Sequence, residues 1–263
     1  MLICCSFRNS DPLVPVVIRI KSEAYRADHL GNVYTVNEDE LTKFLPNGKM
    51  AGRYSNLRLG SISHLDVSNP LKILVYYRDF QQIVFLDNQL SVNSNAVSLE
   101  EMGYEQAELV CASANNSFWV YDKQNNELLR FDENSKKIAA TGNLKQVLQS
   151  EITPVYMVEY NNYLFLNSPQ HGIYVFDMFG AFSKVVSIKG LRDFQLMENV
   201  IYYQRDSMLC SYNHKLFEEA CVSPGLVPVS AHLQYQNKKL YTGNKDSIVC
   251  RSFTPQATNS KSE

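Results

Sequence analysis

The segment FWVYDKQNNELLRFD (residues 118–132) consists of two short apolar runs separated by a polar turn. The first run, Phe118–Tyr121, is rich in aromatic residues, and the second, Leu128–Phe131, is followed by Asp132. Short runs of aromatic and aliphatic residues between polar turns are typical of β-strands. Because both runs are continuous rather than alternating, we expect strands that are buried on both faces.

The same pattern recurs six times along the chain. The apolar residue that ends the third strand of each unit, here called the anchor residue, is usually followed by Asp or Asn. The six anchor residues are Phe44, Leu86, Phe131, Phe176, Tyr212 and Phe253. They lie 36 to 45 residues apart, close to the period of a four-stranded propeller blade, and the runs lack the 3.6-residue spacing of helical repeats. We therefore predict an all-β fold, a six-bladed β-propeller over residues 16–253.

The ring is predicted to be closed by the N-terminal strand. The sixth unit ends after Phe253, because residues 254–263 are polar and interrupted by Pro255, as a disordered C-terminal tail would be. The apolar run Val16–Ile20 belongs to no unit of its own. We expect it to pair beside the last unit, because closure of the ring removes an exposed sheet edge.

The segments between the third strand of one unit and the next unit predict further elements. Fourth strands are expected at residues 90–97, 138–141, 182–188 and 216–222. Ser98–Glu101 has the Ser-x-x-Glu spacing of a helix capping box, and residues 143–150 have the pattern of one or two helical turns.

The overall charge argues against a nucleic-acid partner. The chain has 25 Lys and Arg against 27 Asp and Glu, a net charge of −2. A nucleic-acid-binding protein is expected to carry a basic surplus or a basic stripe, and the sequence has neither. No apolar stretch approaches the ~18 residues that a membrane-spanning helix needs.

The six cysteines show no metal-site spacing. They are Cys4, Cys5, Cys111, Cys210, Cys221 and Cys250, and they form no C-x-x-C pair or Cys/His cluster. We interpret Cys111, Cys210 and Cys250 as small core residues of strands. Whether two of these form a disulfide cannot be deduced from the sequence.

Motifs of known catalytic sites are absent from the sequence. It contains no G-x-S-x-G, H-E-x-x-H, P-loop or G-x-G-x-x-G. His29, His171 and His214 fall at turns and are interpreted as surface residues. His64 and His232 fall in first strands, which line the channel of a propeller, and are the histidines best placed to contact a ligand.

Four carboxylates lie in or beside first strands: Asp28, Asp66, Glu108 and Glu159. If they gathered around the axis they could hold Ca²⁺, which takes six to eight oxygen ligands. We favour the alternative, that they are the polar lining of a wet channel. Asp87, Asp132 and Asp177 repeat at one position of the unit and indicate turn capping. No catalytic, cofactor-binding or metal-binding residue is predicted.

The first 15 residues have two interpretations. Met1–Cys5 is apolar and the segment after it is polar. It is either the remnant of an export signal, with Leu2–Cys5 similar to a bacterial lipoprotein cleavage box, or a short cytosolic start.

Two blade motifs, GNVYTV (residues 31–36) and GIYVFDMFG (172–180), resemble NHL-like and YncE-like propellers. The stretch from Asp66 to Gln81 resembles a family of Bacteroidetes propellers, and the likeness spans residues 24–253. The resemblance implies a non-enzymatic, protein-binding propeller of the periplasm or cell envelope, such as a plug-like subunit of type 9 secretion or of an outer-membrane assembly. The alternatives are a cytoplasmic location and a calcium-dependent lactonase-type propeller acting on a small molecule.

Overall fold

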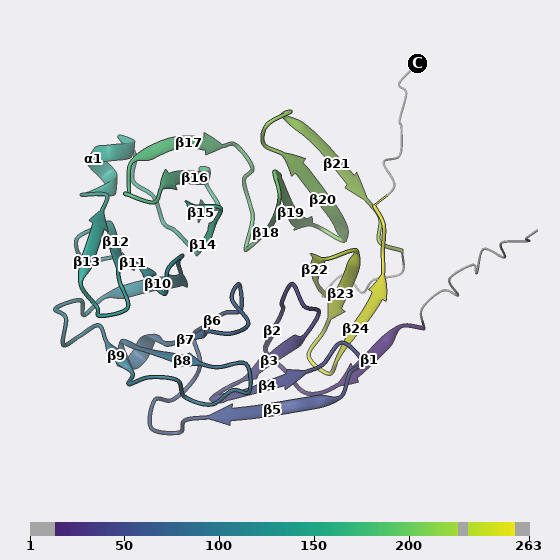
Figure 1. The fold of residues 1–263 in the computed structure, drawn as a ribbon. Helices are drawn as coiled ribbons and strands as arrows, with labels where there is room; N and C mark the ends of the chain where they lie inside the picture. The colour runs from purple at the N-terminus through teal and green to yellow at the C-terminus, as the bar shows by residue number, and fades with distance from the viewer. Residues whose placement is uncertain (1–13, 226–230, 256–263) are drawn as a thin grey trace, which may run out of the picture.

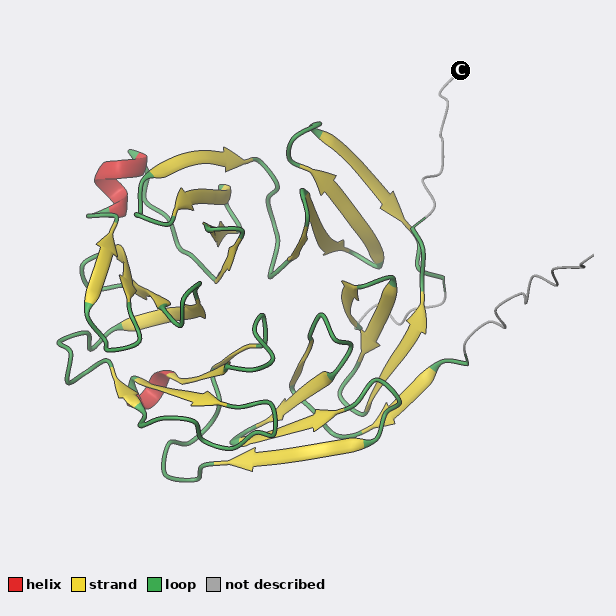
Figure 2. Ribbon diagram, in the orientation of Figure 1, coloured by secondary structure: helices red, strands yellow, loops and turns green. Residues whose placement is uncertain are grey.

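The computed structural model describes residues 14–225 and 231–255. In this part of the chain six antiparallel, four-stranded sheets stand as blades around a central channel (Figure 1). The six-bladed propeller predicted from the repeat is therefore confirmed. Figure 2 shows the two short helices lying outside the innermost ring of strands.

Within each blade the first strand lies at the channel and the fourth at the outer edge. Only the sixth blade takes strands from both ends of the chain. Blades 1 and 2 contain β2 (Ala24–Ala27), β3 (Val33–Asn37), β4 (Glu40–Phe44) and β5 (Met50–Ser55), then β6 (His64–Asp66), β7 (Ile73–Tyr77), β8 (Gln82–Leu86) and β9 (Val97–Ser98). Blades 3 and 4 contain β10 (Ala107–Ala112), β11 (Phe118–Asp122), β12 (Glu127–Phe131) and β13 (Lys137–Ala140), then β14 (Tyr156–Tyr160), β15 (Tyr163–Ser168), β16 (Gly172–Asp177) and β17 (Phe182–Val186). Blades 5 and 6 contain β18 (Gln195–Met197), β19 (Val200–Arg205), β20 (Met208–Asn213) and β21 (Glu218–Val222), then β22 (His232–Gln236), β23 (Lys239–Gly243), β24 (Ser247–Ser252) and β1 (Val16–Arg19).

The N-terminal strand closes the ring as predicted. β1 pairs antiparallel with β24, with Val16 opposite Cys250 and Ile18 opposite Ile248. Gly48, in the last turn of blade 1, has φ +82° and lies against this strand, since a Cβ there would come within 2.8 Å of Val16 Cγ1. Glycine suits this position because it tolerates positive φ and a close approach.

One apolar cluster fills each of the six interfaces between blades. The second strands are the most deeply buried, and no residue of Phe118–Tyr121 is more than 5% exposed. This burial on both faces explains the continuous apolar runs in the sequence. The cluster between blades 5 and 6 is the smallest, with Leu209, Tyr235 and Leu240 as its buried members.

Two sequence predictions about connections were wrong in part. The fourth strand of blade 2 is only Val97–Ser98 rather than residues 90–97, because Leu90 adopts a left-handed conformation in the turn closed by Asp87. At Ser98–Glu101 the capping bond forms, from Glu101 N to Ser98 Oγ at 3.2 Å, but a single turn follows instead of a helix.

The described part of the chain contains two short helices, one of which was predicted. The helix expected at residues 143–150 is α1 (Leu144–Leu148), and the side chain of Asn143 caps it. A second short helix, η1 (Arg78–Phe80), was not predicted. Most of the expected N-terminal segment and C-terminal tail lies outside the described residues.

The strand order gives the ring two different faces. Turns between first and second strands and between third and fourth strands lie on one side, here called the turn face. Turns between second and third strands and the links between blades lie on the other side, here called the crossover face. A first strand therefore runs from the crossover face to the turn face.

Candidate functional site

The central channel contains a cavity of about 740 Å³. It is lined by the first strands of blades 1, 2, 4, 5 and 6. Asp28, Ser68, Glu198 and Lys238 lie where these strands reach the turn face, so the cavity opens on that face. Its volume falls within the ~300–1,000 Å³ typical of small-molecule sites.

An ion pair separates this cavity from the crossover face. Arg26 Nη2 lies 3.0 Å from Asp193 Oδ2, and His232 Nε2 lies 3.2 Å from Asp193 Oδ1. Arg26 lines the cavity, whereas Asp193 and His232 line a smaller pocket of about 310 Å³ on the opposite side. The cluster formed by Arg26, Asp193 and His232 therefore closes the deep end of the cavity.

The electrostatics of this cluster favour the ionised carboxylate. Burial raises the pKa of Asp193, but the charge of Arg26 and the hydrogen bond and charge of His232 outweigh it, and the pKa lies well below its ordinary value.

His64 and Tyr156 stand beside the cluster with unused polar atoms. Their rings lie 6.3 Å apart between centroids, and neither side chain hydrogen-bonds to a described residue. Burial lowers the pKa of His64 to about 4, and the charge of Arg26 acts in the same direction while Asp66 and Asp193 oppose it. The imidazole of His64 is therefore neutral at pH 7.

The four predicted carboxylates are not brought together. Asp28 caps its own turn by accepting from the backbone of Leu30 and Asn32, and Glu108 pairs with Arg78 and Lys123 on the crossover face. Within the described ranges, no group of three or more His, Cys, Asp or Glu side chains gathers as metal ligands would.

Asp66 and Glu159 do line the cavity, but their oxygens accept hydrogen bonds from within the protein, including from a neighbouring blade. Asp66 accepts from Ala112 N of blade 3 at 2.9 Å. Glu159 accepts from Ala114 N at 2.9 Å, from Trp119 Nε1 at 2.6 Å and from Ser113 Oγ at 2.5 Å. Both carboxylates thus join blades, and neither offers a set of free ligand atoms.

The repeated aspartates have the role that the sequence indicated. Asp87, Asp132 and Asp177 each accept two backbone N–H bonds within their own turns. Of the two channel histidines, His64 lines the cavity and His232 lies behind the ion pair. His29 is an exposed turn residue as predicted, and it lies at the mouth of the cavity.

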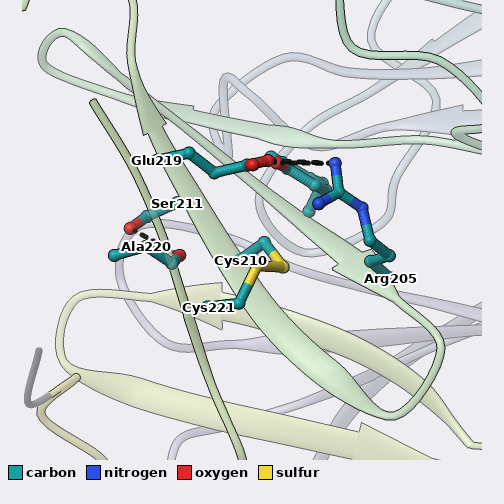
Figure 3. The surroundings of a disulfide bond; sticks show 7 residues. Arg205, Cys210, Ser211, Glu219, Ala220 and Cys221 are labelled. Atoms are coloured by element: carbon teal, nitrogen blue, oxygen red, sulfur yellow. Dashed lines mark hydrogen bonds and ion pairs between the residues drawn. A yellow bond between two sulfur atoms is a disulfide. The ribbon is translucent and has the colours of Figure 1, made fainter. Parts of the chain in front are cut away.

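A disulfide joins Cys210 on β20 to Cys221 on β21 in blade 5 (Figure 3). The two residues are directly opposite in the antiparallel register, and Glu219 on the same hairpin pairs with Arg205 at 2.9 Å. Cys210 is buried, as predicted, and its pairing, which the sequence left open, depends on the register between two strands that brings Cys221 opposite it. Cys111 and Cys250 are buried, as predicted, and both are free.

Large apolar side chains are exposed on the turn face. Phe179 and Phe217 are 70% and 76% exposed, in the third-to-fourth-strand turns of the adjacent blades 4 and 5. Leu216 projects from the same turn as Phe217, and Leu30 and Leu71 project from the first-to-second-strand turns of blades 1 and 2. Side chains of this kind, when gathered on one face, mark interaction surfaces.

Sequence reasoning missed Arg26, Asp193 and Tyr156. They come from blades 1, 5 and 4, and no local motif connects them. Their positions in or just before first strands were the available signal, because first strands surround the channel.

A scan against protein-family models and a search of curated proteins each found no match. Solved propellers match in shape. Virginiamycin B lyase from Staphylococcus aureus gives a TM-score of 0.57 at 10% identity, covering 88% of this chain and 80% of that protein. BamB from Moraxella catarrhalis gives 0.52 at 10% identity, covering 94% and 100%.

A third similar structure is PorZ, a surface component of the type-IX secretion system of Porphyromonas gingivalis. It gives a TM-score of 0.54 at 13% identity, covering 86% of this chain and 31% of PorZ. The chain is a six-bladed β-propeller. At these identities the likeness shows the fold alone, and enzymes and assembly subunits both occur among the similar structures.

Proposed function

We propose that this propeller binds another protein through its turn face, as a non-enzymatic subunit of a secretion or outer-membrane assembly in the bacterial cell envelope. The observation that carries the proposal is the exposed apolar set on that face, above all Phe179 and Phe217. Exposed aromatic side chains are enriched at protein interfaces because they bury a large area on binding.

The disulfide supports the envelope location. Disulfides persist in oxidising compartments such as the periplasm and are rare in the cytosol. Cys210 and Cys221 lie on adjacent strands of a well-paired hairpin, so the bond needs no movement of the backbone. Peptide mapping under non-reducing conditions, on protein prepared from cells of the native host, should recover the two cysteines as one linked peptide; recovery as free thiols would contradict this location.

The similar structures are consistent with an assembly subunit, since BamB and PorZ carry the same fold. A plug-like role in type 9 secretion is the finer form of the proposal. No helix within the described residues is long and apolar enough to cross a membrane.

The test is a pull-down from solubilised envelopes with the Phe179→Asp/Phe217→Asp double variant. We expect the wild-type protein to retain a stoichiometric partner and the double variant to lose it, because two charges would replace the apolar contact. Leu57→Asp/Val147→Asp is the matched control, since both residues are exposed on the crossover face. Equal retention by both variants, or no partner for the wild type, would contradict the proposal.

A further inference from the structure

We infer that the cavity in the channel is a binding site for an uncharged saccharide. This inference goes beyond the protein-binding role and does not depend on it. It rests on a distinction among the polar groups of the cavity wall. Some already form hydrogen bonds or ion pairs within the protein, and others have no such partner among the described residues.

The charged groups of the inner wall are neutralised within the protein. Arg26 is paired with Asp193 and also donates from Nη1 to the backbone oxygen of Tyr25 at 3.1 Å. The oxygens of Asp66 and Glu159 accept from backbone and side-chain donors of blades 2 and 3. A charged ligand would find no uncompensated partner at this depth, and burying it unpaired would be costly.

Apart from the charged Glu198 and Lys238 at its mouth, the wall offers uncharged hydrogen-bonding groups. They are the neutral imidazole of His64, the hydroxyl groups of Tyr156, Tyr202 and Tyr235, and the amide of Gln236, none of which hydrogen-bonds through its side chain within the described residues. Hydroxyl, amide and imidazole groups each donate or accept, and a ligand with many hydroxyl groups can satisfy both roles.

Aromatic rings line part of the wall, together with aliphatic side chains. Tyr202 and Tyr235 lie 4.8 Å apart between ring centroids, and Tyr156 packs edge-on against Phe194 at 5.3 Å. Rings of this kind bury apolar C–H surface while their hydroxyl groups remain available to the ligand. Hydroxyl-rich molecules with apolar C–H faces are saccharides, and the cavity is large enough for a small one.

The protein carries its own reporter for this cavity. Trp119 is the single tryptophan, and its Nε1 donates to Glu159, a residue that lines the cavity. A ligand in contact with Glu159 should therefore change the fluorescence of Trp119.

The experiment titrates the whole protein with three neutral probes: maltotriose, cellotriose and triacetylchitotriose. Trp119 emission and isothermal calorimetry are the readouts. Chitotriose and trigalacturonate serve as cationic and anionic counterparts of similar size. We expect at least one neutral probe to saturate below about 10 mM and its charged counterparts to bind at least about tenfold more weakly.

Tyr156→Phe and His64→Leu should each weaken that binding by about 3- to 10-fold, the loss expected for one hydrogen bond. Tyr104→Phe is the matched control, because this tyrosine packs on Phe131 away from the cavity, and it should leave the affinity unchanged. The inference is overturned if no neutral probe binds, if charged probes bind equally well, or if Tyr156→Phe has no effect.

Discussion

Two arginine–carboxylate pairs lie inside the ring. They differ in whether the polar groups around them already have hydrogen-bond partners. Arg130 and Glu159 are each 5% exposed, and Trp119, Ser113 and Ala114 saturate the carboxylate. Arg26 and Asp193 are 25% and 12% exposed, and the neighbouring His64 and Tyr156 have unused polar atoms. The first pair joins two blades, whereas the second forms the end of a cavity. A buried charge indicates a site only when the groups around it are left free.

The largest effect is expected from Glu159→Ala. It leaves the buried Arg130 without its carboxylate and removes the acceptor of Trp119, so we expect a loss of about 3–5 kcal/mol in the free energy of unfolding. Urea denaturation followed by Trp119 fluorescence measures it. Glu108→Ala is the control, because its ion pairs are on the surface and should contribute about 0–1 kcal/mol. Similar losses for both variants would remove the distinction between the two pairs.

An intermediate effect is expected from Asp193→Asn. The partly hydrated Arg26 loses a charged acceptor, which should cost about 1.5–3 kcal/mol at pH 7. Because the pKa of Asp193 is lower in the folded protein than in the unfolded chain, its contribution is complete above about pH 4 and is lost as the pH falls further. The variant should therefore lose less stability in acid than the wild type. Asp206→Asn, in the same pocket on the crossover face, should show neither change.

The smallest effect at pH 7 is expected from His64→Asn. The folded-state pKa of about 4 lies below that of an unfolded histidine, near 6.5. Between these values the unfolded chain binds a proton that the folded protein does not, so the free energy of unfolding should decrease as the pH is lowered, with a slope approaching about 1.4 kcal/mol per pH unit. His64→Asn should reduce this slope, to which His214 also contributes because its pKa is lowered as well, and the exposed His29→Asn should keep it. A slope of unchanged size in His64→Asn would show that another group causes it.

The fold was predictable because it repeats. Six anchor residues at blade spacing, and an unassigned apolar run at Val16–Ile20, were sufficient for the ring and its closure. The capping role of the turn aspartates was equally predictable, because each accepts hydrogen bonds within its own turn. Blade 2 was less predictable, since its outer strand is shortened by the left-handed Leu90, a conformation that sequence patterns do not favour for leucine.

The candidate site was not predictable to the same extent. Four carboxylates were grouped because they occupy similar places in the repeat: Asp28, Asp66, Glu108 and Glu159. In the structure each forms hydrogen bonds or ion pairs with different neighbours. The pairing of Cys210 with Cys221 depends on the register of one hairpin. Similar positions in a repeat share a place in the blade without sharing neighbours.

The amino-acid sequence by itself determined the number of blades, the burial of their middle strands and the closing strand, because short-range periodicity and the avoidance of open sheet edges are properties of the chain alone. Only the tertiary structure decided that Arg26, His64, Tyr156, Asp193 and His232 converge. They belong to five different blades, and the distances between them are set by the curvature of the ring, which no local pattern encodes.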